Sequence, residues 1–146
     1  MARVSASPVT SATTKELPTE ALTRATPDLA RFRAAAAQYT AMGPNRLPLY
    51  LYAHDRDAER GVRLRTRMFS PLSGTIEDPA TGSAATPLAA LLLSLTKDSE
   101  RRYDIVQGVE MGRPSRLLCT ARRASDGIRA TVGGTCVPVL EGTVEL

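Results

Sequence analysis

Cysteine, histidine and aromatic residues are all scarce in this sequence. There are two cysteines, Cys119 and Cys136, and they form no CxxC pair. This usage favours free buried thiols in a reducing compartment over a disulfide scaffold. Aromatic residues make up 4% of the chain, which is few for stacking on bases, and no RRM, zinc-finger or helix-turn-helix signature is present. We therefore expect no nucleic-acid partner.

Long apolar runs are also missing. The longest lies within residues 84–95, which is too short to cross a bilayer. The first 17 residues have no charged start followed by an apolar block, so we expect no signal peptide. These features predict a cytoplasmic protein without a membrane partner.

What the sequence does contain is the composition of one ordinary domain over residues 1–146. Hydrophobic residues make up 42% and charged residues 23% of the 146 residues, which is enough apolar material for a core. Ten glycines and ten prolines indicate many turns, and therefore strands.

The net charge of +4 comes mainly from arginine. Arg63, Arg65 and Arg67 alternate with uncharged residues, which places the three side chains on one face of a strand. We interpret them as a solvated strand face. A basic patch that attracts a carboxylate substrate or an acidic partner is the alternative. Nucleic-acid binding would instead be revealed by a strong salt dependence.

Hydrophobic periodicity and turn signals predict the order of the elements. A turn into a short helix is expected over 16–22, with Thr19 as a possible N-cap. A clearer helix is expected over 26–38, with Thr26 as N-cap and Pro27 at the first helical position. Strands are expected within 1–15 and at 48–54, 62–70, 103–107, 115–122, 128–132, 135–140 and 143–146.

One further helix is expected after the turn at 78–84, ending near Lys97. Its leucines and alanines leave no polar face, and a helix that is apolar on all sides is buried on all sides. In a chain this short, the strands before and after it are the natural cover. The sequence therefore predicts an α+β fold, with a central apolar helix wrapped by a curved, mostly antiparallel sheet.

The turn itself is a candidate site. The N-terminus of a helix presents unpaired N–H groups and the positive end of the helix dipole. Gly82 and Ser83 permit close approach of a carboxylate or phosphate there, and Asp78 at the mouth can accept a proton or bond an amine or hydroxyl. The structural alternative is that Asp78 and Ser83 only cap a tight turn.

Two positions compete as the start of this helix. Thr86 followed by Pro87 is a good start signal, because proline suits the first helical position. If the helix begins at Gly82 instead, Pro87 lies near the end of its first turn and can remove one backbone bond.

Two stretches of the sequence resemble the signatures of a known family. Residues 67–92 resemble the first signature of the phenazine-biosynthesis isomerase (PhzF-like) family, and residues 105–117 resemble its second. The TPDL stretch at 26–29, the GG turn and the closing EGTVEL also match in order. The resemblance spans essentially the whole chain. It implies the C-terminal domain of a diaminopimelate epimerase-like pair, in which each domain wraps a mostly antiparallel sheet around a central helix.

The resemblance also implies a chemistry that needs no cofactor and no metal. In this family a substrate lies between the two domains and a proton is moved on it, as in the isomerisation of a dihydro-hydroxyanthranilate. It implies Asp78 as an acid/base, with Gly82 and Ser83, and more weakly Thr81, holding a small anionic metabolite. Two polar residues of the second signature, Gln107 and Arg113, are expected to shape a turn or the domain interface.

The family's principal acid/base, a glutamate, belongs to an N-terminal domain that no segment of this sequence resembles. The lone His54 is expected on the surface or packed, and does not replace it. Proton transfer across a carbon needs both a base and a donor. We therefore expect this chain to complete its site with a separate N-terminal-domain chain or as a homo-oligomer. The alternatives are a self-associating binding or structural module without catalysis, and a remnant or excised piece with no function of its own.

Overall fold

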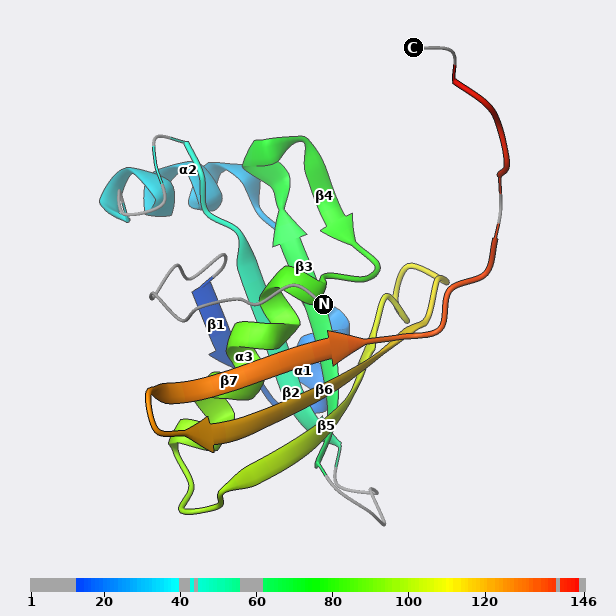
Figure 1. Ribbon diagram of the computed structural model, residues 1–146. Helices are drawn as coiled ribbons and strands as arrows, with labels where there is room; N and C mark the ends of the chain where they lie inside the picture. Colours follow the sequence, from blue (N-terminus) through cyan, green and yellow to red (C-terminus); the bar gives the residue numbers. More distant parts are fainter. Residues whose placement is uncertain (1–12, 40–42, 44, 56–61, 139, 145–146) are drawn as a thin grey trace.

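The computed structural model describes residues 13–39, 43, 45–55, 62–138 and 140–144. Within these residues the chain forms a mixed α/β unit (Figure 1). The elements, in chain order, are β1 (Thr13–Glu16), α1 (Thr19–Arg24), α2 (Leu29–Gln38), β2 (Leu49–Asp55), β3 (Val62–Ser70), the 3-10 turn η2 (Pro71–Ser73), β4 (Thr75–Asp78), α3 (Gly82–Ser94), β5 (Glu100–Gln107), β6 (Ser115–Ala124) and β7 (Gly127–Gly133).

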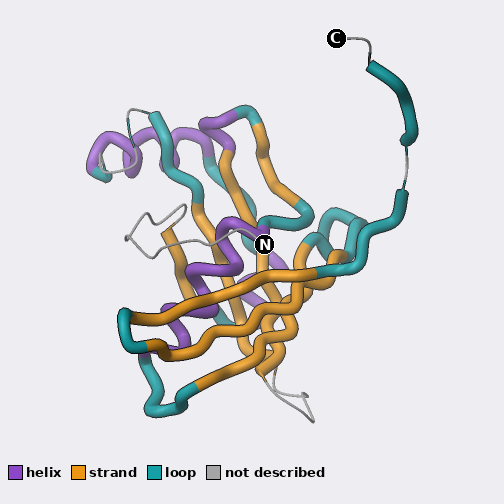
Figure 2. The backbone as a smooth tube through the Cα atoms, in the orientation of Figure 1, coloured by secondary structure: helices purple, strands orange, loops and turns teal. Residues whose placement is uncertain are grey.

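The strands form one seven-stranded sheet in the order β1-β2-β3-β5-β6-β7, with β4 paired to β3 beside this path. The β1–β2 and β3–β5 pairs are parallel, and the other four pairs are antiparallel. Figure 2 shows the strands curving around α3. The architecture is the predicted one: a curved, mostly antiparallel sheet around a central helix.

The sheet has a hydrophobic core on each of its faces. On the concave face, Leu88, Ala89 and Leu93 of α3 pack against Leu64 of β3 and Ile105 of β5, all of them fully buried. Alternate residues point to opposite faces of a strand, so the neighbours of these side chains face outward. There a second cluster joins α1 and α2 to β2 and β3; it includes Leu22, Phe32, Leu51 and Phe69.

Helix α3 is buried along most of its surface, though less completely than the sequence predicts. Six of its residues are buried, while Leu91 is 43% exposed and Leu95, just past its end, is 73% exposed. The helix ends at Ser94 rather than near Lys97. In the part of the chain that the structure describes, β1 and β7, the two ends of the strand order, do not pair, so the sheet is open and covers one broad side of the helix rather than its whole circumference. No helix among the described residues is both long enough and apolar enough to span a membrane.

The helix starts were predicted less well. α2 begins at Leu29, because Asp28 is its N-cap: the carboxylate of Asp28 accepts hydrogen bonds from the backbone N–H groups of Ala30 (2.9 Å) and Arg31 (3.1 Å). The predicted cap at Thr26 was therefore wrong. α1 begins at Thr19, and its N-cap is Pro18.

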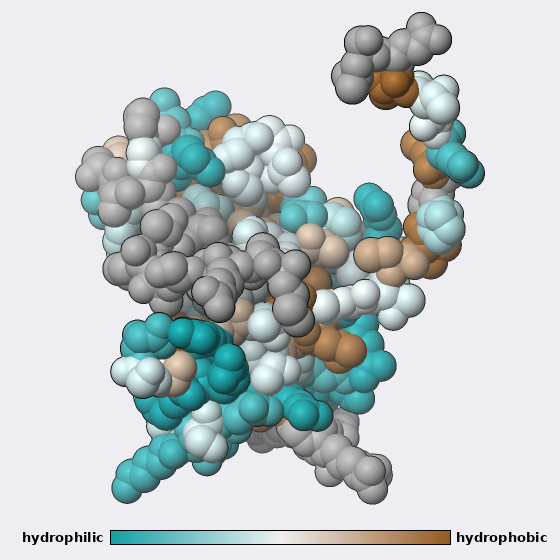
Figure 3. Space-filling model, viewed as in Figure 1, coloured by the Kyte–Doolittle hydropathy of each residue, from teal (hydrophilic) through white to brown (hydrophobic). Residues whose placement is uncertain are grey.

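The described residues at the end of the chain contain neither of the two strands predicted at 135–140 and 143–146. Residues 134–138 and 140–144 have no regular structure and extend away from the sheet (Figure 1). Figure 3 shows hydrophobic side chains along this tail, where Val137, Leu140 and Val144 are exposed. Apolar β-forming residues need a neighbouring strand, and this part of the described chain has none. The predicted strands at 1–15 and 143–146 lie partly outside the described residues.

Candidate active site

Asp78 is the last residue of β4 and is half-buried. β4 pairs with β3, where Met68 lies opposite Asp78. One carboxylate oxygen, Oδ2, accepts a hydrogen bond of 2.7 Å from the Thr81 hydroxyl. The other, Oδ1, lies 3.4 Å from the backbone nitrogen of Ala80, which is a weak bond. These contacts turn the carboxylate toward the beginning of α3.

Helix α3 begins at Gly82, so the alternative start at Thr86 is excluded. The N-cap is Thr81, whose carbonyl accepts from the N–H groups of Ala84 (3.2 Å) and Ala85 (3.0 Å). Pro87 lies inside the helix and contributes no N–H to it. The sequence Gly82-Ser83 therefore stands at the N-terminus of the helix, with Gly82 half-buried and Ser83 exposed.

The side chain of Gln107, at the end of β5, holds this turn from behind. It is fully buried. Its Nε2 donates to the carbonyl oxygen of Asp78 (2.7 Å) and to Oγ1 of Thr81 (2.9 Å). Its Oε1 accepts from the backbone N–H of Thr81 (3.3 Å) and from the hydroxyl of Tyr50 (3.0 Å). Gln107 therefore shapes a turn, as expected, and the turn is that of the first signature.

Gly108 brings the backbone of the second signature against that of the first. It has a φ of +78°, which favours glycine. A Cβ at this position would lie 2.5 Å from the carbonyl oxygen of Arg113 and 2.9 Å from that of Pro79. The two sequence signatures therefore form one structure, in which Gln107 and Gly108 support the Asp78–Thr81 turn.

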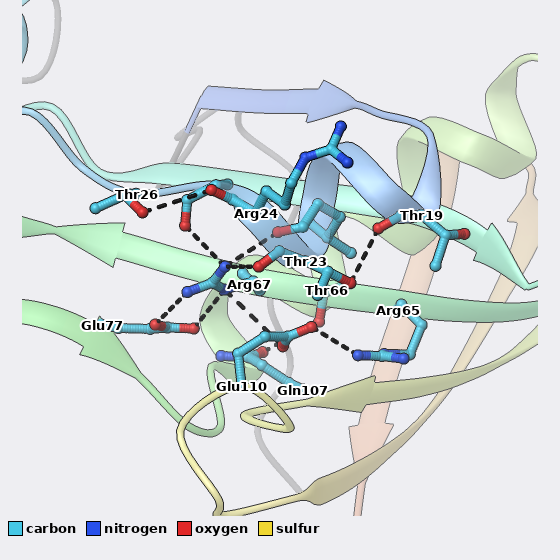
Figure 4. A network of polar contacts seen from close by, with 12 residues as sticks. Thr19, Thr23, Arg24, Thr26, Arg65, Thr66, Arg67, Glu77, Gln107 and Glu110 are labelled. Atoms are coloured by element: carbon cyan, nitrogen blue, oxygen red, sulfur yellow. Dashed lines mark hydrogen bonds and ion pairs between the residues drawn. The ribbon is translucent and has the colours of Figure 1, made fainter.

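A buried arginine holds the strand that carries Asp78 (Figure 4). The side chain of Arg67 is 8% exposed and forms a bidentate pair with Glu77, with both N–O distances at 2.8 Å. Its Nη1 also donates to three carbonyl oxygens at the end of α1, those of Leu22, Thr23 and Ala25. The hydrogen bonds to Glu77 raise the pKa of Arg67 above its ordinary value. This arginine ties α1, β3 and β4 together.

The prediction of a solvated arginine face was therefore wrong for most of the stripe. Only Arg63 is exposed. Arg65 is half-buried and pairs with Glu110 at 2.7 Å (Figure 4). The reason is that α1 and α2 pack on the outer face of β2 and β3, and Glu77 and Glu110 supply the opposite charges.

Glu77 and Asp78 are adjacent, and their side chains go to different partners. The carboxylate of Glu77 is taken up by Arg67, whereas Asp78 forms no ion pair within the described residues. Asp78 is therefore the acidic side chain of this turn that has no charged partner among the described residues.

The other residues singled out from the sequence lie away from this turn or serve structural roles. His54 is exposed, 3.8 Å from Glu16, as a surface histidine would be. The backbone of Arg113 closes the loop after β5 by bonding to the carbonyl of Gly108. Cys119 is buried, which raises the pKa of its thiol to about 11. Cys136 is exposed, so the expectation that it lies in the core was wrong.

The sequence did not point to two buried polar residues behind the site, Tyr50 and Thr66, or to the partners of Gln107. A signal for Gln107 was present, because Tyr103, Ile105 and Gln107 alternate along β5 and all face the core. A glutamine in such a position must find buried partners. Nothing in the local sequence, however, indicates that these partners lie 26 and 29 residues earlier.

Comparison with known proteins gives a consistent family assignment. The sequence model of the phenazine biosynthesis-like protein family matches residues 7–142. A trans-2,3-dihydro-3-hydroxyanthranilate isomerase of Pseudomonas chlororaphis is 44% identical over 91 residues, which is 61% of this chain and 33% of that protein. An uncharacterized isomerase of Mesorhizobium japonicum is 39% identical over 79 residues, 52% of this chain and 26% of that protein. The match thus spans about a third of the length of the Pseudomonas relative and about a quarter of the Mesorhizobium one.

Solved structures support the fold. The Bacillus anthracis phenazine biosynthesis protein of the PhzF family superposes with a TM-score of 0.66 at 23% identity, over 83% of this chain and 40% of that chain. A predicted epimerase of Pseudomonas aeruginosa superposes with a TM-score of 0.52 at 20% identity, over 86% and 38%. The α+β, epimerase-like fold predicted from the sequence is confirmed. With the family match over residues 7–142, these findings show that the chain belongs to the phenazine biosynthesis-like protein family.

Proposed function

We propose that this chain forms part of the active site of a cofactor-independent isomerase or epimerase. The reaction is proton transfer on a small metabolite that bears a carboxylate. The observation that carries the proposal is the position of Asp78, whose carboxylate is free of ion pairs within the described residues and lies beside the N-terminus of α3. Relatives that share up to 44% identity with the chain are named isomerases.

Asp78 is the acid/base of this half of the site. Its carboxylate is held by hydrogen bonds at the end of β4, so it is fixed in place for a substrate. The backbone at Gly82 and Ser83 holds the substrate carboxylate, because a helix N-terminus offers N–H donors and a positive dipole end. The hydroxyl of Thr81, also considered as a substrate contact, is 2.7 Å from Asp78 and acts through it.

The remainder of the site comes from another stretch of polypeptide. Proton transfer across a carbon needs a second acid/base group on the opposite side. The relatives are about three times as long as the region they share with this chain. We therefore place the chain as the C-terminal half of such an enzyme. The second group belongs to an N-terminal domain, to a separate chain that carries one, or to a second copy of this chain.

The test begins with the protein isolated from its own host, with every chain in the complex identified. The preparation is incubated with trans-2,3-dihydro-3-hydroxyanthranilate, the compound named for three Pseudomonas relatives, and the reaction is followed by proton NMR. We expect turnover by the wild type and none by Asp78→Asn, with unchanged circular dichroism. Asp126→Asn is the matched control, since Asp126 pairs with Arg129 in the exposed β6–β7 turn.

Three outcomes separate the possibilities. Normal turnover by Asp78→Asn removes Asp78 from the mechanism. Binding of the compound without turnover by a homo-oligomer favours the alternative function, a self-associating binding module without catalysis. Turnover that appears only when a second, different chain is present identifies that chain as the source of the other acid/base group.

A further inference from the structure

The buried polar groups behind Asp78 form a chain of hydrogen bonds whose direction the structure determines. Hydroxyl hydrogens and the two ends of a glutamine amide are not distinguished by position alone. Here, however, the amide of Gln107 contacts two backbone groups that cannot exchange roles. The N–H of Thr81 can only donate, and the C=O of Asp78 can only accept.

These two groups fix the orientation of the amide. The end that faces the N–H of Thr81 must be Oε1, and the end that faces the carbonyl of Asp78 must be Nε2. The reversed amide would set a donor against a donor and an acceptor against an acceptor in a fully buried position. Each such buried mismatch costs about 1–3 kcal/mol, so the reversed orientation is excluded.

The orientation of Gln107 then decides the direction of the next bonds. Nε2 has a second hydrogen, which it donates to Oγ1 of Thr81 at 2.9 Å. The hydroxyl of Thr81 accepts there, so its own proton is available for Oδ2 of Asp78 at 2.7 Å. On the other side, Oε1 can only accept, so the Tyr50 hydroxyl donates to it at 3.0 Å.

Tyr50 is suited to remain a donor in this chain. It has no exposed surface, and burial raises the pKa of its hydroxyl far above the ordinary value. The phenol therefore keeps its proton near neutral pH. The Tyr50 oxygen also lies 3.1 Å from Oγ1 of Thr66; because the single phenol proton goes to Gln107, the Thr66 hydroxyl is the donor in this bond, which anchors the far end of the chain in β3.

We propose that Gln107 and Thr81 are positioning residues that fix the Asp78 carboxylate, with Oδ2 occupied by the Thr81 hydroxyl and Oδ1 presented to the substrate. Among the described residues, Oδ1 has only the weak contact to the Ala80 nitrogen at 3.4 Å, so it retains acceptor capacity toward a ligand. The hydrogen bonds from Tyr50 through Gln107 and Thr81 all run toward this carboxylate. The catalytic part of the inference rests on the proposed function, whereas the direction of the bonds does not.

The first measurement is independent of activity. In the wild type, both side-chain amide protons of Gln107 should be protected from hydrogen exchange, since each has a buried acceptor. In Thr81→Val one proton loses its acceptor, and we expect its exchange, read by NMR, to quicken about tenfold while the other proton stays protected. Thr81→Ser should restore the wild-type pattern. Thr120→Val, which removes a hydroxyl from β6 outside this network, should leave it unchanged.

The second measurement uses the isomerase assay. Thr81→Val should lower kcat by roughly 10- to 100-fold with KM unchanged, because the carboxylate loses a charge-assisted bond that orients it. Thr81→Ser should recover most of the loss. If Thr81→Val does not fold, Thr81→Ala serves in both measurements.

The outcomes distinguish this inference from the proposed function. An unchanged exchange pattern in Thr81→Val, or equal quickening of both protons, overturns the inference whatever the activity. A raised KM with unchanged kcat overturns the positioning role and makes Thr81 a substrate contact. A wild type without isomerase activity, but with one proton selectively released in Thr81→Val, counts against the proposed function and supports the assigned direction of the bonds.

Discussion

Gly108 offers the sharpest test of how the two sequence signatures support each other, through the variant Gly108→Ala. The added Cβ would lie 2.5 Å from Arg113 O, 2.9 Å from Pro79 O and 3.0 Å from Pro79 Cα. All three are backbone atoms, so no side-chain rotation can relieve the overlap. The variant should force the loop after β5 away from the turn that carries Asp78.

The magnitude has two parts, and the chain provides a control for one of them. A positive φ costs a non-glycine residue about 1–2 kcal/mol. Overlap in a packed site adds about 1–3 kcal/mol. Gly74 has a φ of +82°, close to the +78° of Gly108, but a Cβ there would have nothing within 4 Å. Gly74→Ala should therefore lose about 1–2 kcal/mol of unfolding free energy, and Gly108→Ala about 2–5 kcal/mol.

The assay is urea unfolding followed by far-ultraviolet circular dichroism. With a slope of about 2 kcal/mol per molar urea, a difference of ~2 kcal/mol between the two variants separates their midpoints by about 1 M. Equal midpoints would refute the reasoning, because they would mean that the close approach of Gly108 to Pro79 contributes nothing beyond its backbone angle.

Three further predictions concern charge and thiols. Arg67→Met should lower the unfolding free energy by about 3–5 kcal/mol, because it leaves the largely buried carboxylate of Glu77 without its partner. The control Arg63→Met removes an exposed guanidinium and should lower the unfolding free energy by less than about 1 kcal/mol. Equal losses in the two variants would contradict the importance of the buried pair. Asp104→Asn should lose less than about 1 kcal/mol at pH 7. The hydrogen bond from Arg116 lowers the pKa of Asp104 below 3.8, so this stabilisation is present above that pH and is lost as the pH falls through the lower, folded-state value. The difference in urea midpoint between wild type and Asp104→Asn should therefore shrink as the pH is lowered. A difference that stays constant would exclude this cause. Finally, Ellman's reagent should react with one thiol in the native protein and with two in denaturant. The reason is that Cys136 is exposed, whereas Cys119 is buried and burial raises the pKa of its thiol to about 11. Two rapid reactions in the native state would contradict the burial of Cys119.

Much of the fold was accessible from the sequence because local patterns determine it. The strand at 62–70 has the predicted bounds, and the apolar segment after Gly82 is the central helix. Alternation and apolar runs are properties of neighbouring residues, so a single sequence carries them. The short strand β4 was missed, since its four residues include two acids and pair with β3 alone.

The tail shows the limit of that local information. Residues 135–140 and 143–146 have β-forming composition, and the sequence predicts two strands there. A strand is stabilised by its partner as much as by its own residues. The described residues of this segment pair with no strand of the sheet, so their β-forming preference does not produce a strand.

The turn that carries the proposed site could be predicted from the sequence, but the side chains that support it could not. Asp78, Thr81, Gly82 and Ser83 lie within six residues of sequence, and the structure places them together at the start of α3, as a turn into a helix must. The side chain of Gln107 reaches them from a strand that lies 26 to 29 residues later in the sequence. Such contacts depend on sheet order, which periodicity does not specify.

The arginine stripe was also predicted wrongly because contacts between distant parts of the sequence decide its environment. Alternation placed Arg63, Arg65 and Arg67 on one face correctly, but it could not tell that α1 covers that face. The same alternation operates in β4, where it sends Glu77 toward Arg67 and leaves Asp78 on the side of the helix. Two adjacent carboxylates would otherwise repel each other and compete for one partner. The alternation avoids that competition: Glu77 takes the buried arginine, and Asp78 has no ion pair among the described residues.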